Sequence, residues 1–88
     1  MLPTPRGDGT AAVDGRRVYL TATQERLLRR LLESPQQLVR WEALVAVVDD
    51  GRFDPPENAQ VYWHIHHLRR KIGAKHLLTV RGRGVLLR

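Results

Sequence analysis

The chain has 88 residues, no cysteine and a formal net charge of +6. Its length suits one small domain with a modest core and leaves no room for a deep, enclosed catalytic pocket. The absence of cysteine excludes disulfides and thiolate metal sites, and the apolar run Leu44–Val48 is too short to cross a bilayer. Met1–Gly9 has proline and charge where a signal peptide needs an apolar core, so we expect a cytoplasmic protein without membrane contact.

The positive charge is confined to one end of the chain. Residues 58–88 hold seven Lys or Arg, all four histidines and no acidic residue, which gives a net charge of +7. Residues 1–57 hold eight basic and nine acidic side chains, a net charge of −1. A basic patch on one side of a domain is typical of nucleic-acid binders.

The chain is predicted to begin with a flexible lead-in over residues 1–9, with or without a short edge strand. Residues 10–88 are predicted to form one domain. Thr10–Val13 and Arg17–Leu20 flank Asp14-Gly15, a dipeptide suited to the positive φ angles of a tight turn. We therefore predict a β-hairpin at the start of the domain.

A first helix is predicted over about residues 22–34. Thr21 and Gln24 match a capping box, in which each side chain hydrogen-bonds to the backbone of the other residue. Ser34-Pro35 ends the run. The expected buried positions on this helix are Leu27, Leu28, Leu31 and Leu32.

Two more helices follow. The second is predicted over Trp41–Val48, with a stop at Asp49-Asp50-Gly51. Its expected buried positions are Trp41, Leu44, Val45 and Val48. The third is predicted over about residues 55–73, because Asp54-Pro55-Pro56-Glu57 combines a capping residue, a first-turn proline and an early acidic residue.

The third helix has two chemically different faces. Val61, Ile65, Leu68 and Ile72 recur at helical spacing and predict a buried seam. At about 100° per residue, the opposite face is then determined. It carries Gln60, Trp63, His67 and Arg70, flanked by His64, His66 and Lys71.

A second hairpin closes the chain. Leu77–Val80 and Val85–Arg88 are β-rich runs joined by Arg81-Gly82-Arg83-Gly84. A helix that fits the major groove, followed by a basic hairpin for the minor groove or phosphates, is the winged-helix arrangement. The predicted fold class is therefore α+β: a winged helix-turn-helix with a short N-terminal hairpin, three helices and a C-terminal wing.

Three stretches carry a family resemblance over about residues 10–88. They are Leu20-Thr21-x-x-Gln24 with Leu27-Leu28, the run from His64 to Gly73, and Thr79-Val80-Arg81-Gly82-x-Gly84. In these the chain resembles the winged-helix effector domain of OmpR/PhoB-type response regulators. The resemblance implies a transcription factor on direct-repeat half-sites, with the third helix as major-groove reader.

The resemblance also implies individual roles. His64 and His67 fall at reading-helix contact positions, His66 and Arg69 near phosphate, Thr79 at the base of the wing, and Arg81 is the wing arginine. The chain departs from the family pattern at Val85, commonly tyrosine, and at Trp41, where a phosphate-contacting arginine is typical. It departs as well at Glu25, which replaces an aromatic residue, and at the two histidines His66 and His67, which replace arginines.

Several alternatives stay open at this stage. Trp63 either contacts DNA or folds under the wing as part of the core. Phe53 is either a minor core residue or, by the resemblance, part of a loop 51–56 that contacts RNA polymerase. The histidines lack a third ligand, so we expect no metal, and no catalytic constellation can be assembled.

We therefore predict a sequence-specific, double-stranded DNA-binding transcriptional regulator without cofactor or enzymatic activity, which could bind tandem sites as a homodimer. The alternatives are a protein-interaction module and an RNA-binding domain. The predicted DNA-binding residues are Gln60, Trp63, His64, His66, His67, Arg69, Arg70, Lys71, Thr79, Arg81 and Arg83.

Overall fold

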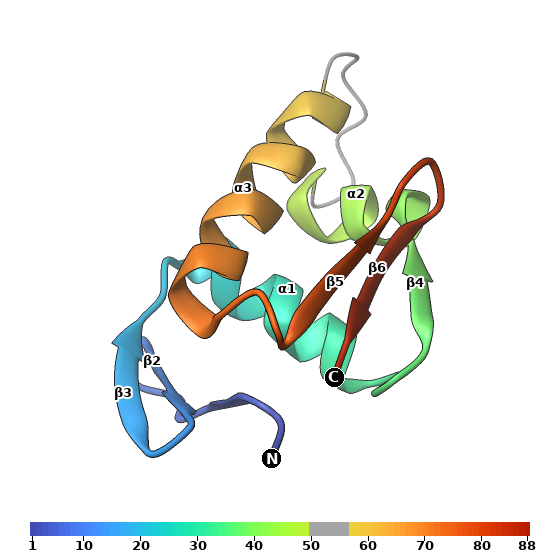
Figure 1. The fold of residues 1–88 in the computed structure, drawn as a ribbon. Coiled ribbons are helices and arrows are strands. Elements are labelled where there is room, and N and C mark those ends of the chain that lie inside the picture. Colours follow the sequence, from blue (N-terminus) through green and yellow to red (C-terminus); the bar gives the residue numbers. More distant parts are fainter. Residues whose placement is uncertain (50–56) are drawn as a thin grey trace.

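Three helices pack with two small β-sheets in the computed structural model, which describes residues 1–49 and 57–88 (Figure 1). The predicted arrangement of helices and terminal hairpins is confirmed. No helix in the described ranges is both long and apolar enough to span a membrane. In chain order the elements are β1 (Thr4–Pro5), β2 (Thr10–Val13), β3 (Arg16–Tyr19), α1 (Ala22–Leu32), β4 (Leu38–Arg40), α2 (Trp41–Asp49), α3 (Glu57–Ile72), β5 (Leu77–Val80) and β6 (Gly84–Leu87).

The N-terminal sheet has the order β1-β2-β3, and all its pairs are antiparallel. Asp14 and Gly15 have φ angles of 50° and 80°, as the tight hairpin turn requires. The hairpin prediction is confirmed, although β3 begins one residue earlier than predicted. Within the predicted lead-in, β1 pairs with β2 as an edge strand, and Pro3 is fully buried.

Helix α1 begins with the predicted capping box. The Gln24 amide donates to the Thr21 hydroxyl at 3.1 Å, and the Thr21 amide donates to the Gln24 side-chain oxygen at 3.0 Å. The helix ends at Leu32, two residues before the predicted end, and Glu33 caps it. Leu27, Leu28 and Leu31 are fully buried, and Leu32 is partly buried.

The C-terminal sheet contains a strand that the sequence pattern did not predict. Its order is β4-β6-β5, so β4, from the segment before α2, lies beside the last strand of the wing. Helix α2 follows β4 directly. Leu44 is fully buried as predicted, whereas Trp41, Val45 and Val48 are only half-buried, because α2 lies at the edge of the core.

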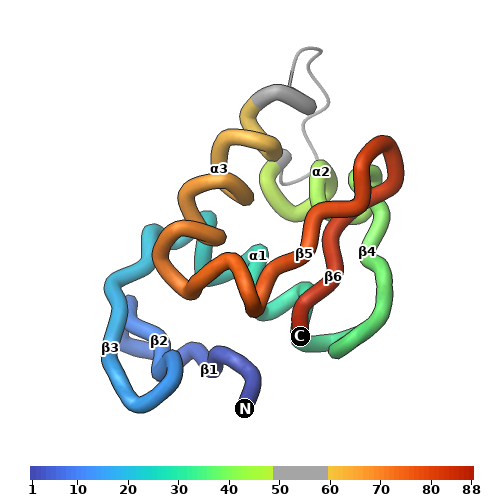
Figure 2. The backbone as a smooth tube through the Cα atoms, viewed as in Figure 1, coloured from blue at the N-terminus to red at the C-terminus, as the bar shows by residue number. Residues whose placement is uncertain are grey.

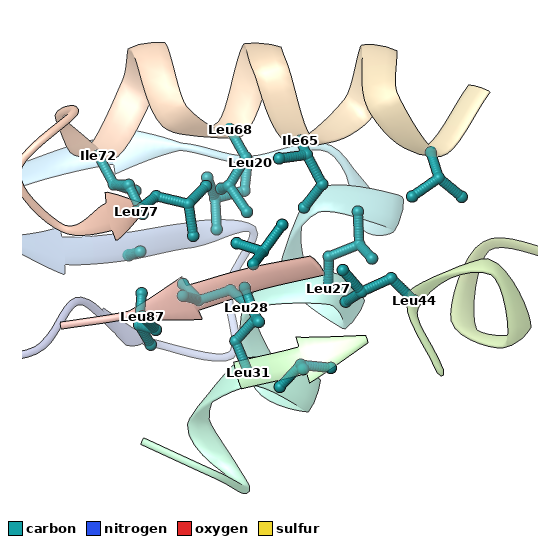
Figure 3. Packing of buried hydrophobic residues seen from close by; sticks show 14 of the residues in the cluster. Leu20, Leu27, Leu28, Leu31, Leu44, Ile65, Leu68, Ile72, Leu77 and Leu87 are labelled. Atoms are coloured by element: carbon teal, nitrogen blue, oxygen red, sulfur yellow. The ribbon is translucent and has the colours of Figure 1, made fainter. Parts of the chain in front are cut away.

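Helix α3 presents its predicted seam to the core (Figure 3). Val61, Ile65, Leu68 and Ile72 are each at most 3% exposed. They pack with residues of α1, α2 and the C-terminal sheet, among them Leu27, Leu44 and Leu77. The helix spans Glu57–Ile72, within the predicted range; the start signal over residues 54–56 lies outside the described residues.

A buried histidine joins the two sheets. His76 is 6% exposed; its Nδ1 lies 2.8 Å from the carbonyl oxygen of Arg88, and its Nε2 lies 2.9 Å from a carboxylate oxygen of Asp14. The hydrogen bond from His76, helped by Lys75 at 3.4 Å, lowers the pKa of Asp14. The turn between β2 and β3 is thereby held against the C-terminal end of β6.

Candidate nucleic-acid interface

The outward face of α3 carries the residues predicted to read DNA bases. Trp63 is 58% exposed, so it does not fold under the wing as a core residue. Gln60 and Arg70 are exposed on the same face, one turn before and two turns after the indole. A buried seam therefore holds the helix on the domain while a polar and aromatic surface faces solvent.

The three histidines of α3 differ in their surroundings. His67 packs against Trp63 with ring centroids 4.3 Å apart, and His66 is exposed. His64 is half-buried, and its buried Nδ1 has no hydrogen-bond partner. Burial, and then the charge of His67, lower the pKa of His64 below its ordinary value, so the neutral ring is favoured. Over residues 1–49 and 57–88, no three potential metal ligands lie together.

The cationic residues at the end of α3 do not share one environment. Arg69 and Arg70 are exposed. Lys71 is half-buried, and its ammonium group donates to the Gln24 side-chain oxygen at 2.8 Å. The carbonyl of Lys71 also accepts a hydrogen bond from the guanidinium of Arg16 at 3.3 Å. Lys71 thus fastens the end of α3 to the start of α1, and only the two arginines extend freely toward solvent.

The wing presents two arginine side chains on a tethered turn. Arg81 and Arg83 are both exposed, and Gly82 between them has a φ of 74°. The amide of Arg83 donates to the carbonyl of Val80 at 3.0 Å, and its carbonyl accepts from the Trp41 amide at 3.1 Å. Thr79 is exposed on β5, where the resemblance implied the base of the wing.

Trp41 connects the wing with α3, a role that the sequence analysis did not predict. Its backbone amide bonds to Arg83, and its indole meets the Tyr62 ring edge-on, with centroids 4.4 Å apart. In the backbone trace, the wing turn lies beside the start of α2 (Figure 2). In the sequence, the hint of a contact between Trp41 and α3 was Tyr62, which lies next to the seam residue Val61. An aromatic residue beside a buried seam has many possible partners, so the sequence did not identify Trp41 as the partner.

Residues 15–87 match the family model described as "Transcriptional regulatory protein, C terminal". The chain belongs to this family. The predicted resemblance to OmpR/PhoB-type effector domains is thereby confirmed. Two curated relatives are the swarming motility regulation protein RssB of Serratia marcescens, 34% identical over 86% of this chain, and the response regulator protein PmrA of Pseudomonas aeruginosa, 36% identical over 82%. The chain spans about a third of the length of each: 34% of RssB and 32% of PmrA.

Solved structures of other DNA-binding and response-regulator domains have the same fold. The C-terminal domain of the nisin resistance regulator NsrR superposes with a TM-score of 0.78 at 29% identity, covering 99% of this chain and 91% of that one. The DNA-binding domain of CpxR from E. coli gives 0.74 at 35% identity, covering 96% and 86%. The DNA-binding domain of the response regulator AdeR, solved with an intercistronic region, also gives 0.74, with 98% and 92% covered; its 18% identity shows the fold alone.

Proposed function

We propose that this domain regulates transcription by binding double-stranded DNA sequence-specifically, with α3 in the major groove and the wing, about residues 79–86, on the minor groove or phosphates. The observation that carries the proposal is the arrangement of α3, which hides an aliphatic seam and exposes Gln60, Trp63 and Arg70 within an acid-free stretch of chain. An α-helix fits the major groove, where each base pair presents a distinct set of donors and acceptors. Membership of the family, and its DNA-binding relatives, support the same conclusion.

The proposal assigns two kinds of contact. Phosphate contacts hold the register of a protein on the duplex, and base contacts supply the sequence preference. We assign base readout to Gln60, Trp63, His64, His67 and Arg70. We assign phosphate or minor-groove contacts to His66, Arg69, Lys71, Thr79, Arg81 and Arg83. To contact a phosphate, the ammonium group of Lys71 must break its hydrogen bond with the Gln24 side-chain oxygen or bind both partners at once. We therefore expect Lys71 to contribute less to binding than Arg69.

Two further partners belong to the proposal. The first is RNA polymerase, through loop 51–56. This loop, which includes Phe53, lies outside the described residues. The second is another copy of the chain on tandem half-sites, whose centres would lie about one helical turn of DNA apart. The cytoplasmic location predicted from the sequence and the absence of enzymatic activity complete the proposal.

Selection of bound duplexes from a random pool tests the proposed function directly. The expected result is a short enriched sequence that the domain binds more tightly than a scrambled duplex of equal length. Competition with structured RNA separates the DNA-binding proposal from the RNA-binding alternative. Failure to retain any duplex, even at low salt, would instead favour the protein-interaction module.

Replacing Arg81 with alanine is expected to weaken binding to the enriched duplex by about 5- to 150-fold, equivalent to about 1–3 kcal/mol. The exposed guanidinium of Arg81 lies on the wing turn, which is hydrogen-bonded to the Trp41 amide through Arg83. Because the turn is already held in place, the guanidinium can approach the DNA backbone without a further loss of loop entropy. Fluorescence anisotropy with labelled duplex measures the change. Arg17→Ala is the matched control, because it removes the same charge from an exposed arginine of the N-terminal sheet. Equal affinities for the two variants would remove the wing from the proposed mechanism.

A further inference from the structure

We propose that the tilted ring pair of Trp63 and His67, with 56° between the ring planes, reads the 5-methyl group of a thymine, so that the preferred duplex carries thymine beneath the middle of α3. This inference rests on the proposed function and names the base chemistry that the interface selects. The ring pair of Trp63 and His67 belongs to the outward face of α3 described above.

The first observation is the unusual exposure of a large ring surface. Trp63, one of two tryptophans in the chain, is 58% exposed. Its described ring neighbours are His67 at 4.3 Å and His64 at 5.1 Å between centroids, both on the same helix. Tyr62, also 50% exposed, differs because α2 supplies its ring partner Trp41. Of Tyr62 and Trp63, the two large aromatic side chains described on α3, Trp63 is therefore the one whose ring contacts come only from its own helix.

Trp63 lies in the middle of the face of α3 that points away from the core. Trp63 follows the buried Val61 by two residues, which places it about 200° around the helix and away from the core. Gln60 lies one turn before it and Arg70 two turns after it, and both are exposed. A duplex that meets this face meets the ring pair between two polar side chains. Gln60 and Arg70 can form bidentate hydrogen bonds with adenine and guanine respectively, and the ring pair cannot.

The ring pair of Trp63 and His67 suits an apolar group on a base edge. In the major groove the only apolar group on a base edge is the thymine methyl group. The faces of an indole and an imidazole offer this methyl group an apolar surface without an unsatisfied polar atom. The packing of His67 against Trp63 restricts the indole before binding, so less side-chain entropy is lost on contact.

Replacing thymine with deoxyuridine removes the methyl group and leaves the hydrogen-bonding groups of the base pair unchanged. Starting from the enriched duplex, each thymine is replaced in turn and affinity is measured by anisotropy. At one or two of the thymine positions, we expect a single replacement to weaken binding of the wild-type domain by about three- to sixfold, the effect of no longer burying one methyl group. Trp63→Ala is expected to bind more weakly overall and to lose this sensitivity at the same positions.

Two controls keep the result interpretable. Tyr62→Ala removes the neighbouring exposed aromatic ring and is expected to retain the sensitivity to deoxyuridine. Circular dichroism verifies that Trp63→Ala is folded, as expected for a side chain outside the buried seam. The inference is overturned if no replacement changes wild-type affinity, if the enriched duplex lacks thymine, or if Trp63→Ala keeps the wild-type sensitivity. Specific binding would then still stand, whereas absence of any enriched duplex would remove the proposed function and this inference together.

Discussion

Raising the salt concentration from about 50 to about 200 mM is expected to weaken binding of the domain to duplex DNA by about 250- to 1,000-fold. Arg69, Arg81 and Arg83, which are assigned to phosphate or minor-groove contacts, are exposed on α3 and the wing, and residues 58–88 contain no acidic side chain to offset them. With roughly four to six phosphates neutralised, the logarithm of the binding constant falls against the logarithm of salt with a slope near −4 to −5. Anisotropy titrations at several salt concentrations measure this slope.

The contribution of the wing to that slope can be isolated. Replacing Arg81 and Arg83 together with alanine is expected to make the slope shallower by about two, one for each lost phosphate contact. Arg17→Ala is expected to leave the slope unchanged, since β3 lies in the other sheet. A flat response of the wild-type domain over this range would contradict phosphate contacts as the source of affinity.

Replacing Gly84 with alanine is expected to destabilise the domain by more than about 3 kcal/mol, above the usual range for overpacking. A Cβ atom at Gly84 would lie 2.8 Å from the Cα of Arg40, and closer still to the carbonyl oxygen of Val39. These are backbone atoms of β4, so no side-chain rotation can make room. Because Gly84 pairs with both Arg40 and Val80, the shift would disturb both ladders of the C-terminal sheet.

Thermal unfolding followed by circular dichroism measures this effect. A loss of 3 kcal/mol corresponds to a fall in Tm of at least about 12 °C for a domain of this size. Gly82→Ala is the matched control: its φ of 74° strains an alanine, but the space around its Cβ is open. That strain costs only about 1–2 kcal/mol. If both variants unfolded at the same temperature, the close approach of β4 and β6 would not limit the residue at position 84.

Local patterns in the sequence predicted the elements that carry the interface. The period of Val61, Ile65 and Leu68 indicated which face of α3 is buried, and Asp14-Gly15 indicated a tight hairpin turn. The capping box of α1 was likewise readable from two residues three positions apart. Such features depend on backbone periodicity and on hydrogen bonds between near neighbours, which a single sequence displays directly.

Strand β4 shows where this reasoning fails. Leu38–Arg40 is only three residues long, with no turn dipeptide or extended alternation of its own. It is a strand because β6, more than forty residues later, offers it a free edge. The same limit applies to β1: the sequence allowed a short edge strand in residues 1–9, but only the tertiary structure shows that it pairs with β2.

By itself the sequence determined the helices, both hairpin turns and the gathering of positive charge in the last third of the chain. The tertiary structure alone decided that Trp41 joins the wing to α3, that Lys71 is fastened to Gln24, and that His76 meets Asp14 across 62 residues. Local periodicity and turn chemistry act between neighbours in the chain. A contact between distant segments exists only once the common core has brought them together, so its partner cannot be read from either segment alone.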